Sequence, residues 1–508
     1  MRQYITTAID FPNAAPHMGH VMEKIMADSI ARWFRLRGDE TRFQIGTDDH
    51  GIKMQRTAEK AGMHPADLVK QNAPKFQKLF DRLDISYDVF VSTSLTQGHY
   101  ETVQALWSAL SENGLIERRT YAGLYCTGCE SFVTKKDLED GLCPNHRVPP
   151  EEVSEENWFF LLKSQEGFLR TLLHPKTGTY HIVPDYRGNE VRAFLEEGLD
   201  DISFSRPRST LYWGVPVPGD EEQVMYVWCD NLTNYISTLG YCTEKENSLW
   251  WDEAEVTHVI GKDIARFHAL NWPAMLHGAD IRTPDRLLVH GFITSEGQKM
   301  SKSIGNVVDP CDVIERYGVD PLRFYVSHEI PVGRDGDFSW ERFHALYDAK
   351  LRNDLGNLLN RVLVLLHKEG GKIVVPDSPV DRERAGIGWE AYAASMNAFA
   401  LHAALHQAME LVSTLNIAID RTKPWTLTGE ERLVILSRFA ESLRHVSLML
   451  LPFLPQTAQR IATQLHVPYA DQMLKKTFVL GSFRQWGACP EWKSAGTPEI
   501  LFAPIEAK

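Results

Sequence analysis

The sequence predicts an α/β fold: a Rossmann-like, doubly wound parallel sheet that carries an inserted domain and is followed by an all-α bundle. The first hundred residues alternate between strand-like and helix-like patterns, which is typical of βαβ units and of a parallel sheet. From residue 343 to about residue 465 the apolar residues recur at helical spacing instead. The chain has 508 residues, too many for one hydrophobic core, so we expect about two to four domains.

The N-terminal segment contains the first βαβ unit. Residues 3–7 are a β-rich run and predict the first strand. Apolar residues between 22 and 33 are spaced for one face of a helix, and Gly38 is placed to end it. Residues 42–47 predict the next strand, which leads into the loop 46–51. Because ligands of such sheets bind at the carboxyl ends of the strands, we expect functional residues in these loops.

The α/β pattern stops near Arg118 and resumes near residue 207. The segment between them therefore reads as an insertion into the α/β domain. After it, the patterns predict strands at 223–228, 258–260 and 286–290 and a helix over 264–276.

The domain boundaries follow from these changes of pattern. The first bundle helix is predicted from a stripe formed by Leu351, Leu355, Leu358, Leu359, Val362 and Leu366. The predicted segments are 1–117 and 207–308 for the two halves of the catalytic Rossmann-like domain, 118–206 for the inserted connective domain, 309–342 for a linking region and 343–508 for the helical domain.

The composition is that of a globular protein with an acidic balance. The net charge of −13 argues mildly against general affinity for nucleic acid, but it does not exclude a locally basic, shaped site. No run of about 18 apolar residues is present, so we expect no membrane span. The N-terminus shows no signal-peptide pattern, which predicts a cytoplasmic protein. The chain ends soon after the helical region, which favours a monomer.

The motif His17-Met18-Gly19-His20 stands where the first helix is predicted to begin. A helix N-terminus offers unpaired N–H groups and the positive end of the helix dipole, both of which favour phosphate. Gly19 lets a nucleotide approach the backbone, and the two imidazoles can donate to phosphate oxygens. Alone, this pattern is also that of a helix start with two incidental histidines, and nucleotidyltransferases that do not act on tRNA carry it too.

A second motif, Lys299-Met300-Ser301-Lys302-Ser303, lies between Gly297 and Gly305 and follows a predicted strand. Two lysines in a glycine-flanked loop are suited to stabilise the charge that builds up on departing pyrophosphate. The alternative is a solvated basic loop. If the fold brings the two motifs together, they can neutralise a triphosphate from both sides.

Three of the seven cysteines cluster with a histidine as Cys126-x2-Cys129-x13-Cys143-x2-His146. Two close pairs separated by a short loop are the spacing of a zinc knuckle. Four protein ligands leave no open position, so the predicted Zn²⁺ is structural. Chance clustering of thiols is the alternative for the whole set, and another nearby ligand is the alternative for His146.

Together, the two signature motifs resemble those of the class I aminoacyl-tRNA synthetases. The second matches letter for letter, and the first has Met18 in place of Ile. Essentially the whole chain resembles one family of that class, the methionyl-tRNA synthetases, and the single knuckle is similar to one subgroup of it. The other matching segments are Thr6-Thr7, Pro12-Asn13, 46–51, 226–228, 260–264, Phe267-His268 and Trp272-Pro273.

The resemblance implies a methionine–tRNA ligase. Such an enzyme activates methionine with ATP to methionyl-adenylate and transfers it to the 3′-terminal adenosine of tRNA(Met), with Mg²⁺ accompanying ATP. The catalytic residues it implies are His17, His20, Lys299 and Lys302. The ATP-binding residues it implies are His17, Gly19, His20, Gly261, Asp263, Ile293 and Lys302.

The resemblance also implies a methionine pocket, in which Asp48 pairs with the substrate ammonium. Aromatic side chains suit a flexible thioether through sulfur–ring contacts, although core packing is the alternative for each ring alone. The chain departs from the family at Asp10 and Phe11, where an apolar or Tyr residue and then Tyr are common, and at Asn231, where Ala is usual. The implied pocket residues are Ala8, Ile9, Phe11, Asp48, Trp228, Tyr235, Ile264 and His268.

The helical region resembles the family's anticodon-binding bundle. Asn357 and Arg361 are four residues apart and share a helix face, where they can read base edges. Trp425 follows Pro424 and can stack on an unpaired base. A helix-surface pair and a buried Trp are the alternatives that the residues alone would favour; the family context favours anticodon recognition.

Two other functions stay open at this point. One is a class I synthetase of different amino-acid specificity. Against a leucyl enzyme, the chain lacks a large inserted editing domain; against a cysteinyl enzyme, the zinc ligands are local in sequence and look structural. The other is a catalytically inactive, synthetase-like tRNA-binding protein, which the intact His17, His20, Asp48, Lys299 and Lys302 argue against.

Overall fold

The structure is a computed structural model that describes residues 1–128, 131–133, 135, 138–144, 147–241, 248–300 and 306–506. Its largest sheet has six strands, and every neighbouring pair is parallel, which confirms the predicted α/β fold. In spatial order the strands are β3 (Val89–Ser92), β2 (Glu40–Thr47), β1 (Arg2–Thr7), β12 (Glu255–Gly261), β13 (Arg286–His290) and β7 (His181–Val183).

The switch point of this sheet lies between β1 and β12. From there the chain order runs outward in opposite directions, through β2 and β3 on one side and β13 on the other. Such a point is where open α/β sheets bind their ligands, at the carboxyl ends of the strands. One strand within the segment 118–206, β7, pairs with β13 and so belongs to this sheet rather than to the insertion.

Helix α1 (Met18–Arg37) crosses from β1 to β2 and is buried on nearly all sides, because it packs between the sheet and α11 (Val319–Glu329). Gly38 ends it as predicted, at a φ of 96° that residues with a Cβ rarely adopt. The other helices around the sheet are α2 (Ile52–Lys60), α3 (Pro65–Arg82), α4 (His99–Glu112), α5 (Glu166–Leu172), α6 (Asp185–Glu196), α7 (Val227–Ser237), α8 (Leu249–Asp252) and α9 (Trp272–Gly278).

Three smaller sheets surround the parallel one. The insertion is built on a four-stranded antiparallel sheet in the order β5 (Ser131–Val133), β4 (Ile116–Cys126), β6 (Glu151–Phe160), β8 (Ile202–Ser203). The other two have the orders β10 (Pro216–Val217), β11 (Asp220–Met225), β9 (Ser205–Pro207) and β15 (Gln298–Lys299), β14 (Ile293–Ser295), β16 (Gly336–Phe338).

Two sequence predictions need correction here. The strand predicted at 223–228 ends at Met225, it is antiparallel, and Val227 already begins α7. An apolar run alone does not distinguish a strand from a buried helix, which is why the prediction ran too far. The helix predicted over 264–276 is not regular: a π-helical segment, Phe267–Asn271, precedes α9.

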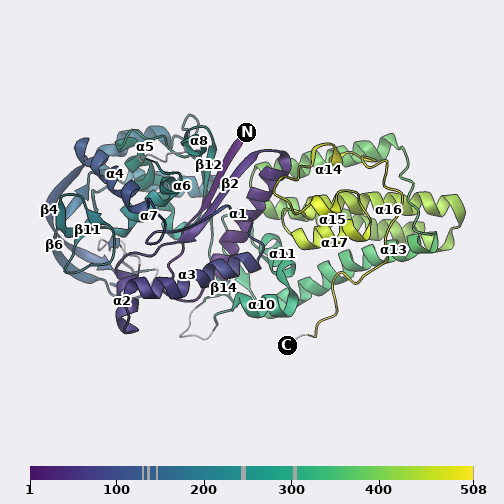
Figure 1. Cartoon of the computed structure of the whole chain (residues 1–508), viewed down its shortest axis with the longest axis horizontal. Helices are drawn as coiled ribbons and strands as arrows, with labels where there is room; N and C mark the ends of the chain where they lie inside the picture. The colour runs from purple at the N-terminus through teal and green to yellow at the C-terminus, as the bar shows by residue number, and fades with distance from the viewer. Residues whose placement is uncertain are drawn as a thin grey trace.

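The C-terminal region is helical, as predicted, and extends away from the sheet; Figure 1 shows it to the right of β1, β2 and α1, with β4, β6 and β11 at the opposite end. All six residues of the predicted leucine–valine stripe are fully buried. Among the described residues, none of the helices combines the length and the apolar character that a membrane crossing requires. The helices are α10 (Pro310–Tyr317), α11, α12 (Trp340–Leu346), α13 (Asn357–Lys368), α14 (Pro379–Asn397), α15 (Leu401–Thr422), α16 (Gly429–Leu450) and α17 (Pro455–Gln464).

The sheet and the bundle are joined by a buried charged side chain. Arg323 of α11 donates to Asp28 of α1 at 2.6 Å and to the carbonyl oxygen of Phe453 at 2.7 Å, and it is fully buried. Although burial would raise the pKa of Asp28, Arg32 and Arg323 hold it well below its usual range. The carboxylate therefore stays charged and fixes α1 relative to the bundle.

Candidate active site

The two histidines of the first motif cap α1. The Nδ1 atom of His17 accepts from the Gly19 N–H at 3.1 Å, and the Nδ1 atom of His20 accepts from the His17 N–H at 3.1 Å. The rings stack with their centroids 3.7 Å apart. Because each Nδ1 accepts from a backbone N–H, a neutral ring carries its proton on Nε2. Both imidazoles are thus arranged as Nε2–H donors at a helix N-terminus.

His20 is held in its neutral form. Burial, together with the nearby ammonium of Lys24, lowers its pKa to about 3. A side chain at Gly19 would crowd the first histidine, since a Cβ there would lie 3.0 Å from Cε1 of His17. A ligand that contacts His20 would therefore meet a neutral imidazole donor rather than an imidazolium ion.

Next to the histidines lies a buried ion network that the sequence did not reveal. Lys24 contacts Asp10 at 2.9 Å and Glu23 at 2.7 Å, and Glu23 reaches Nε2 of His290 at 3.0 Å. Burial raises the pKa of Asp10 to about 6, against the opposing effect of the Lys24 ammonium. The unusual residue Asp10 is thus explained by Lys24, and the network joins the ends of β1 and β13 through α1.

The fold brings most of the residues predicted to bind methionine into one apolar cluster. Ala8, Phe11, Trp228, Tyr235 and Ile264 all pack in one apolar cluster beside the sheet, and Ile9 is buried. This brings together residues from β1, α7 and the segment before α9, over more than two hundred positions of sequence.

Tyr235 and His268 form the polar part of this pocket. The Tyr235 hydroxyl donates to Nε2 of His268 at 2.7 Å, because Nδ1 of His268 donates to the Ile264 carbonyl at 3.0 Å. Burial lowers the pKa of His268 to about 4, so the ring is neutral. Phe267, which was not predicted to be a site residue, stacks on Trp228 with the ring centroids 3.8 Å apart.

Asp48 lies at the carboxyl end of β2 and is buried, with 1% of its surface exposed. Asn231 of α7 donates to its Oδ2 atom at 2.5 Å. The backbone N–H of Asp48 donates to the Asp10 carbonyl at 2.9 Å, so the departures at Asp10 and Asn231 both contact the predicted ammonium site.

The loop that carries Asp48 is held by a buried charged triad, which consists of His50, His99 and Asp230. His50 and His99 each contact one oxygen of Asp230 at 2.6 Å. Although burial would raise the pKa of Asp230, the two histidines hold it well below its usual range. Burial would in turn lower the pKa of His50, but the charge and hydrogen bond of Asp230 raise it. This triad fixes the loop behind the pocket; its members are 49 to 180 residues apart, so no local pattern indicates it.

The predicted ATP-binding residues continue around the same edge. Gly261 ends β12, and a Cβ there would lie 2.7 Å from Oδ1 of Asp263. Ile293 begins β14, which packs against α1. The second motif starts in the hairpin of β14 and β15, where Thr294 pairs with Lys299. Lys302 lies outside the described residues, as do Ser301 and Ser303.

The metal prediction falls partly outside the described residues. Cys126 and Cys143 are buried in the insertion, each with 1% exposure, whereas Cys129 and His146 are not described. Among the described residues no group of three or more His, Cys, Asp or Glu side chains could hold a metal ion. Two buried thiols at both ends of the predicted spacing fit a thiolate site, but Zn²⁺ stays a prediction.

The predicted anticodon residues lie in the bundle, away from the sheet. Asn357 begins α13 and is exposed, and Trp425 is 46% exposed, which overturns the alternative of a buried Trp. The guanidinium carbon of Arg361 lies 5.5 Å from the Trp425 ring, and Arg361 also pairs with Asp420 at 2.6 Å. Arg361 and Trp425 are 64 positions apart in the sequence, and the fold brings them together in one exposed patch.

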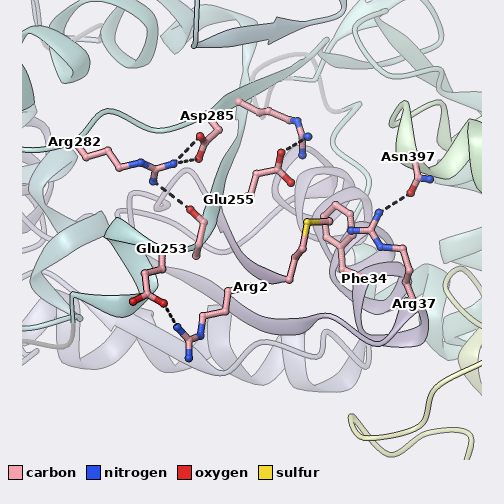
Figure 2. Close-up of a pocket in the computed structure, with 11 residues that line it drawn as sticks. Arg2, Phe34, Arg37, Glu253, Glu255, Arg282, Asp285 and Asn397 are labelled. Atoms are coloured by element: carbon pink, nitrogen blue, oxygen red, sulfur yellow. Dashed lines mark hydrogen bonds and ion pairs between the residues drawn. The ribbon is translucent and has the colours of Figure 1, made fainter.

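A cavity of about 580 Å³ lies at the other edge of the sheet, at the amino ends of β1, β12 and β13. Figure 2 shows Arg2 paired with Glu253, Arg282 with Asp285, and Arg37 with Asn397 of α14. Since its arginines already contact acidic or amide groups, we assign this cavity to the junction with the bundle and not to the substrates.

Comparisons with known proteins match this arrangement. The family model described as "tRNA synthetases class I (M)" matches residues 3–152 and 136–363. The methionine–tRNA ligase of Brucella suis is 41% identical over 482 residues, which cover 92% of both chains. That of Caldanaerobacter subterraneus is 40% identical and covers 99% of this chain and 79% of its own.

Solved structures agree. The methionyl-tRNA synthetase of Mycobacterium tuberculosis in complex with methionyl-adenylate superposes with a TM-score of 0.89 at 34% identity, covering 99% of this chain and 100% of that one. Its free form gives a TM-score of 0.82 at 31% identity.

A parallel sheet with a histidine-capped first crossover helix, matched by that family model, defines a class I aminoacyl-tRNA synthetase. The class leaves the amino acid open, and the relatives decide it. The chain belongs to the methionine–tRNA ligase family. Its members are ligases that form aminoacyl-tRNA, so the other specificities and the inactive binding protein are not favoured.

Proposed function

We propose that this chain joins methionine to tRNA(Met) in two steps at the carboxyl edge of its parallel sheet. In the first, a methionine carboxylate oxygen attacks the α-phosphate of ATP, which forms methionyl-adenylate and releases pyrophosphate. In the second, a ribose hydroxyl of the terminal tRNA adenosine takes the methionyl group and AMP leaves. The observation that carries this proposal is the convergence of His17, His20, Asp48 and the Tyr235–His268 pair at that edge.

For ATP, we assign the triphosphate to the N-terminus of α1. The Nε2–H groups of His17 and His20 would donate to phosphate oxygens, and the lowered pKa of His20 keeps that ring neutral over the physiological pH range. Gly261 and Asp263 would hold the ribose, and Ile293 would lie near adenine. Mg²⁺ would accompany ATP as a counter-charge for its phosphates.

We assign to Lys299 and Lys302 the charge that develops on pyrophosphate as it leaves. Only the backbone of Lys299 is described, in the hairpin of β14 and β15, and β14 packs on the helix that begins at the first motif. Point charges delivered at the leaving group act on the transition state more than on the bound substrate.

For methionine, the pocket offers a dry apolar wall and one buried charge. Trp228, stacked on Phe267, and Tyr235 would enclose the thioether, and the neutral His268 adds no charge beside the sulfur. Asp48 would take the substrate ammonium, because a buried carboxylate is stabilised by an ionic partner.

For tRNA, we propose that the exposed patch of Asn357, Arg361 and Trp425 reads the anticodon. The Trp425 ring can stack on an unpaired base, and Arg361 and Asn357 can donate to base edges. We further propose one structural Zn²⁺ held by Cys126, Cys129, Cys143 and His146. The seven cysteines suit a reducing compartment, so we place the chain in the cytoplasm. We also propose that it is a monomer.

The proposal is tested by charging purified tRNA(Met) with radiolabelled methionine and by measuring adenylate formation separately. Lys302→Ala should slow adenylate formation far more than it weakens methionine binding, which would mark a role in the transition state. Equal losses in rate and binding would contradict that role. No charging of tRNA(Met) by the unaltered chain would contradict the proposed function itself.

A further inference from the structure

The side chain of Asn231 extends from α7 to Asp48, and the residue is buried, with 5% of its surface exposed. Its Nδ2 atom donates to Oδ2 of Asp48 at 2.5 Å. A carboxylate offers only acceptors, so the amide must turn its nitrogen toward Asp48 and its oxygen away. The orientation of the Asn231 amide is thus set by chemistry and not by a choice between two equivalent placements.

Asn231 is itself held in place. Its backbone carbonyl accepts from Nδ2 of Asn234 at 2.6 Å, and Oδ1 of Asn234 accepts from the buried Gln44 of β2 at 2.8 Å. Because this amide chain runs from α7 to the strand that carries Asp48, the Asn231–Asp48 contact is built on two rigid elements. A side chain positioned in this way can determine geometry at the site.

Two polar atoms in this place have no protein partner. Within the part of the chain that the structure describes, no donor reaches Oδ1 of Asn231, and Nε1 of Trp228 is buried without an acceptor. Trp228 precedes Asn231 by three residues, so both lie on the same face of α7. Since buried polar groups are normally satisfied, the buried Nε1 of Trp228 without an acceptor, together with the Asn231 Oδ1 without a donor on the same helix face, indicates a polar ligand.

We propose that Asn231 is a second ammonium-binding residue of this site. Its Oδ1 atom and the carboxylate of Asp48 form a seat with two acceptors for the α-ammonium of the amino acid, while its Nδ2 atom fixes how the Asp48 carboxylate faces the substrate. An ammonium group has three donors and can bond to both residues at once. This inference rests on the proposed function, because it takes the ligand of the pocket to be an amino acid.

The experiment is calorimetric binding with three ligands that differ only around the α-carbon. Methionine carries both charged groups, methioninol keeps the ammonium without the carboxylate, and 4-(methylthio)butanoate keeps the carboxylate without the ammonium. Asn231→Ala should weaken methionine and methioninol by about tenfold and leave 4-(methylthio)butanoate within about twofold. Equal weakening of all three ligands, or of none, would overturn the inference.

Thr233→Val is the matched control, since it removes a buried hydroxyl from the same helix, one that donates to the Cys229 carbonyl at 2.7 Å and takes no part in the contacts of Asn231 and Asp48 described above. It should lower the thermal unfolding temperature and keep the affinity for methionine within about twofold. An exchange of the two side chains adds a rescue: Asp48→Asn should lose affinity, and adding Asn231→Asp should restore about tenfold of it.

No restoration in the exchanged double variant would also overturn the shared seat. The failure of the inference can be told from that of the function. If the unaltered chain binds methionine and Asn231→Ala binds it equally well, the inference falls and the function stands. If the unaltered chain binds neither methionine nor methioninol, both fall.

Discussion

The ammonium of Lys24 lies 2.9 Å from a carboxylate oxygen of Asp10, and both side chains are buried beside the two histidines of the first motif. The same ammonium donates to Glu23 at 2.7 Å and to the Ala8 carbonyl at 3.0 Å. Nε2 of His20 lies 3.9 Å from the other oxygen of Asp10. The two histidines therefore lie next to a buried cluster of charged side chains, in which the Lys24 ammonium neutralises the carboxylates of Asp10 and Glu23.

Lys24→Met should destabilise the fold by about 3–5 kcal/mol, because it leaves Asp10 and Glu23 as neighbouring buried carboxylates without a cation. Urea unfolding followed by circular dichroism measures the loss. Lys78→Met, an exposed lysine of α3, is the control and should stay within about 0.5 kcal/mol of the unaltered chain. A loss below about 1 kcal/mol for Lys24→Met would contradict a network balanced by this residue.

The pH dependence of stability should carry a signature of His268. Its pKa is lowered to about 4 in the folded chain, so between pH 6.5 and about 4 the unfolded chain binds a proton that the folded chain does not. The stability that the neutral His268 provides is thus full above pH 6.5 and is lost as the pH falls toward 4. At pH 5.5 this amounts to about 1 kcal/mol relative to pH 7.5.

His268→Asn removes this titration. The difference in unfolding free energy between the unaltered chain and His268→Asn should shrink by that amount from pH 7.5 to pH 5.5, as read from urea titrations at both values. A difference that stays constant would show that His268 keeps an ordinary pKa in the fold.

Replacement of a predicted zinc ligand in the insertion should lower the zinc content of the chain. If Cys126 binds zinc, Cys126→Ser should lower the bound Zn²⁺, measured by plasma emission spectrometry, from about one ion per chain to well below one. Cys229→Ser is the control, because Cys229 is a buried cysteine of α7 outside the insertion. Full zinc content in Cys126→Ser, or none in the unaltered chain, would contradict the predicted knuckle.

Trp425→Ala should separate the two steps of the reaction. The ring is exposed beside Arg361 and far along the bundle from the sheet, so its removal should impair charging of tRNA and leave pyrophosphate exchange nearly intact. Loss of one stacking partner weakens a base contact by about 1–3 kcal/mol, or about tenfold to a hundredfold in the specificity constant for tRNA. A parallel fall in exchange would show that Trp425 supports the fold instead.

The sequence predicted the elements that are regular and carry motifs. The strand at 286–290 and the end of α1 at Gly38 agree with the structure, because a short apolar run followed by Gly291 and a glycine that caps a helix are local signals. The strand predicted at 223–228 ran into α7, since an apolar run is ambiguous between the two structures. The edge strand β7 was not predicted at all, being three residues long within the insertion.

Some residues of the candidate site could be predicted from the sequence, and others could not. His17, His20 and Gly19 could be predicted because a helix start and its cap are contiguous in sequence. The contacts of Lys24 with Asp10, of Asn231 with Asp48, and of the triad around Asp230 join positions brought together only by the tertiary fold. Only Asp10 and Asn231 gave an indirect signal in the sequence, because the family commonly has an apolar residue or Tyr at the first position and Ala at the second.

The measurement that tests the central claim most directly is ATP–pyrophosphate exchange by the purified chain with each of the twenty amino acids in turn. The reaction needs the histidine-capped helix, the lysine loop and the amino-acid pocket at once, so it reports on the whole site. We predict strong exchange with methionine and, at equal concentration, at most weak exchange with any other amino acid. Strong exchange with another amino acid and none with methionine would contradict the account.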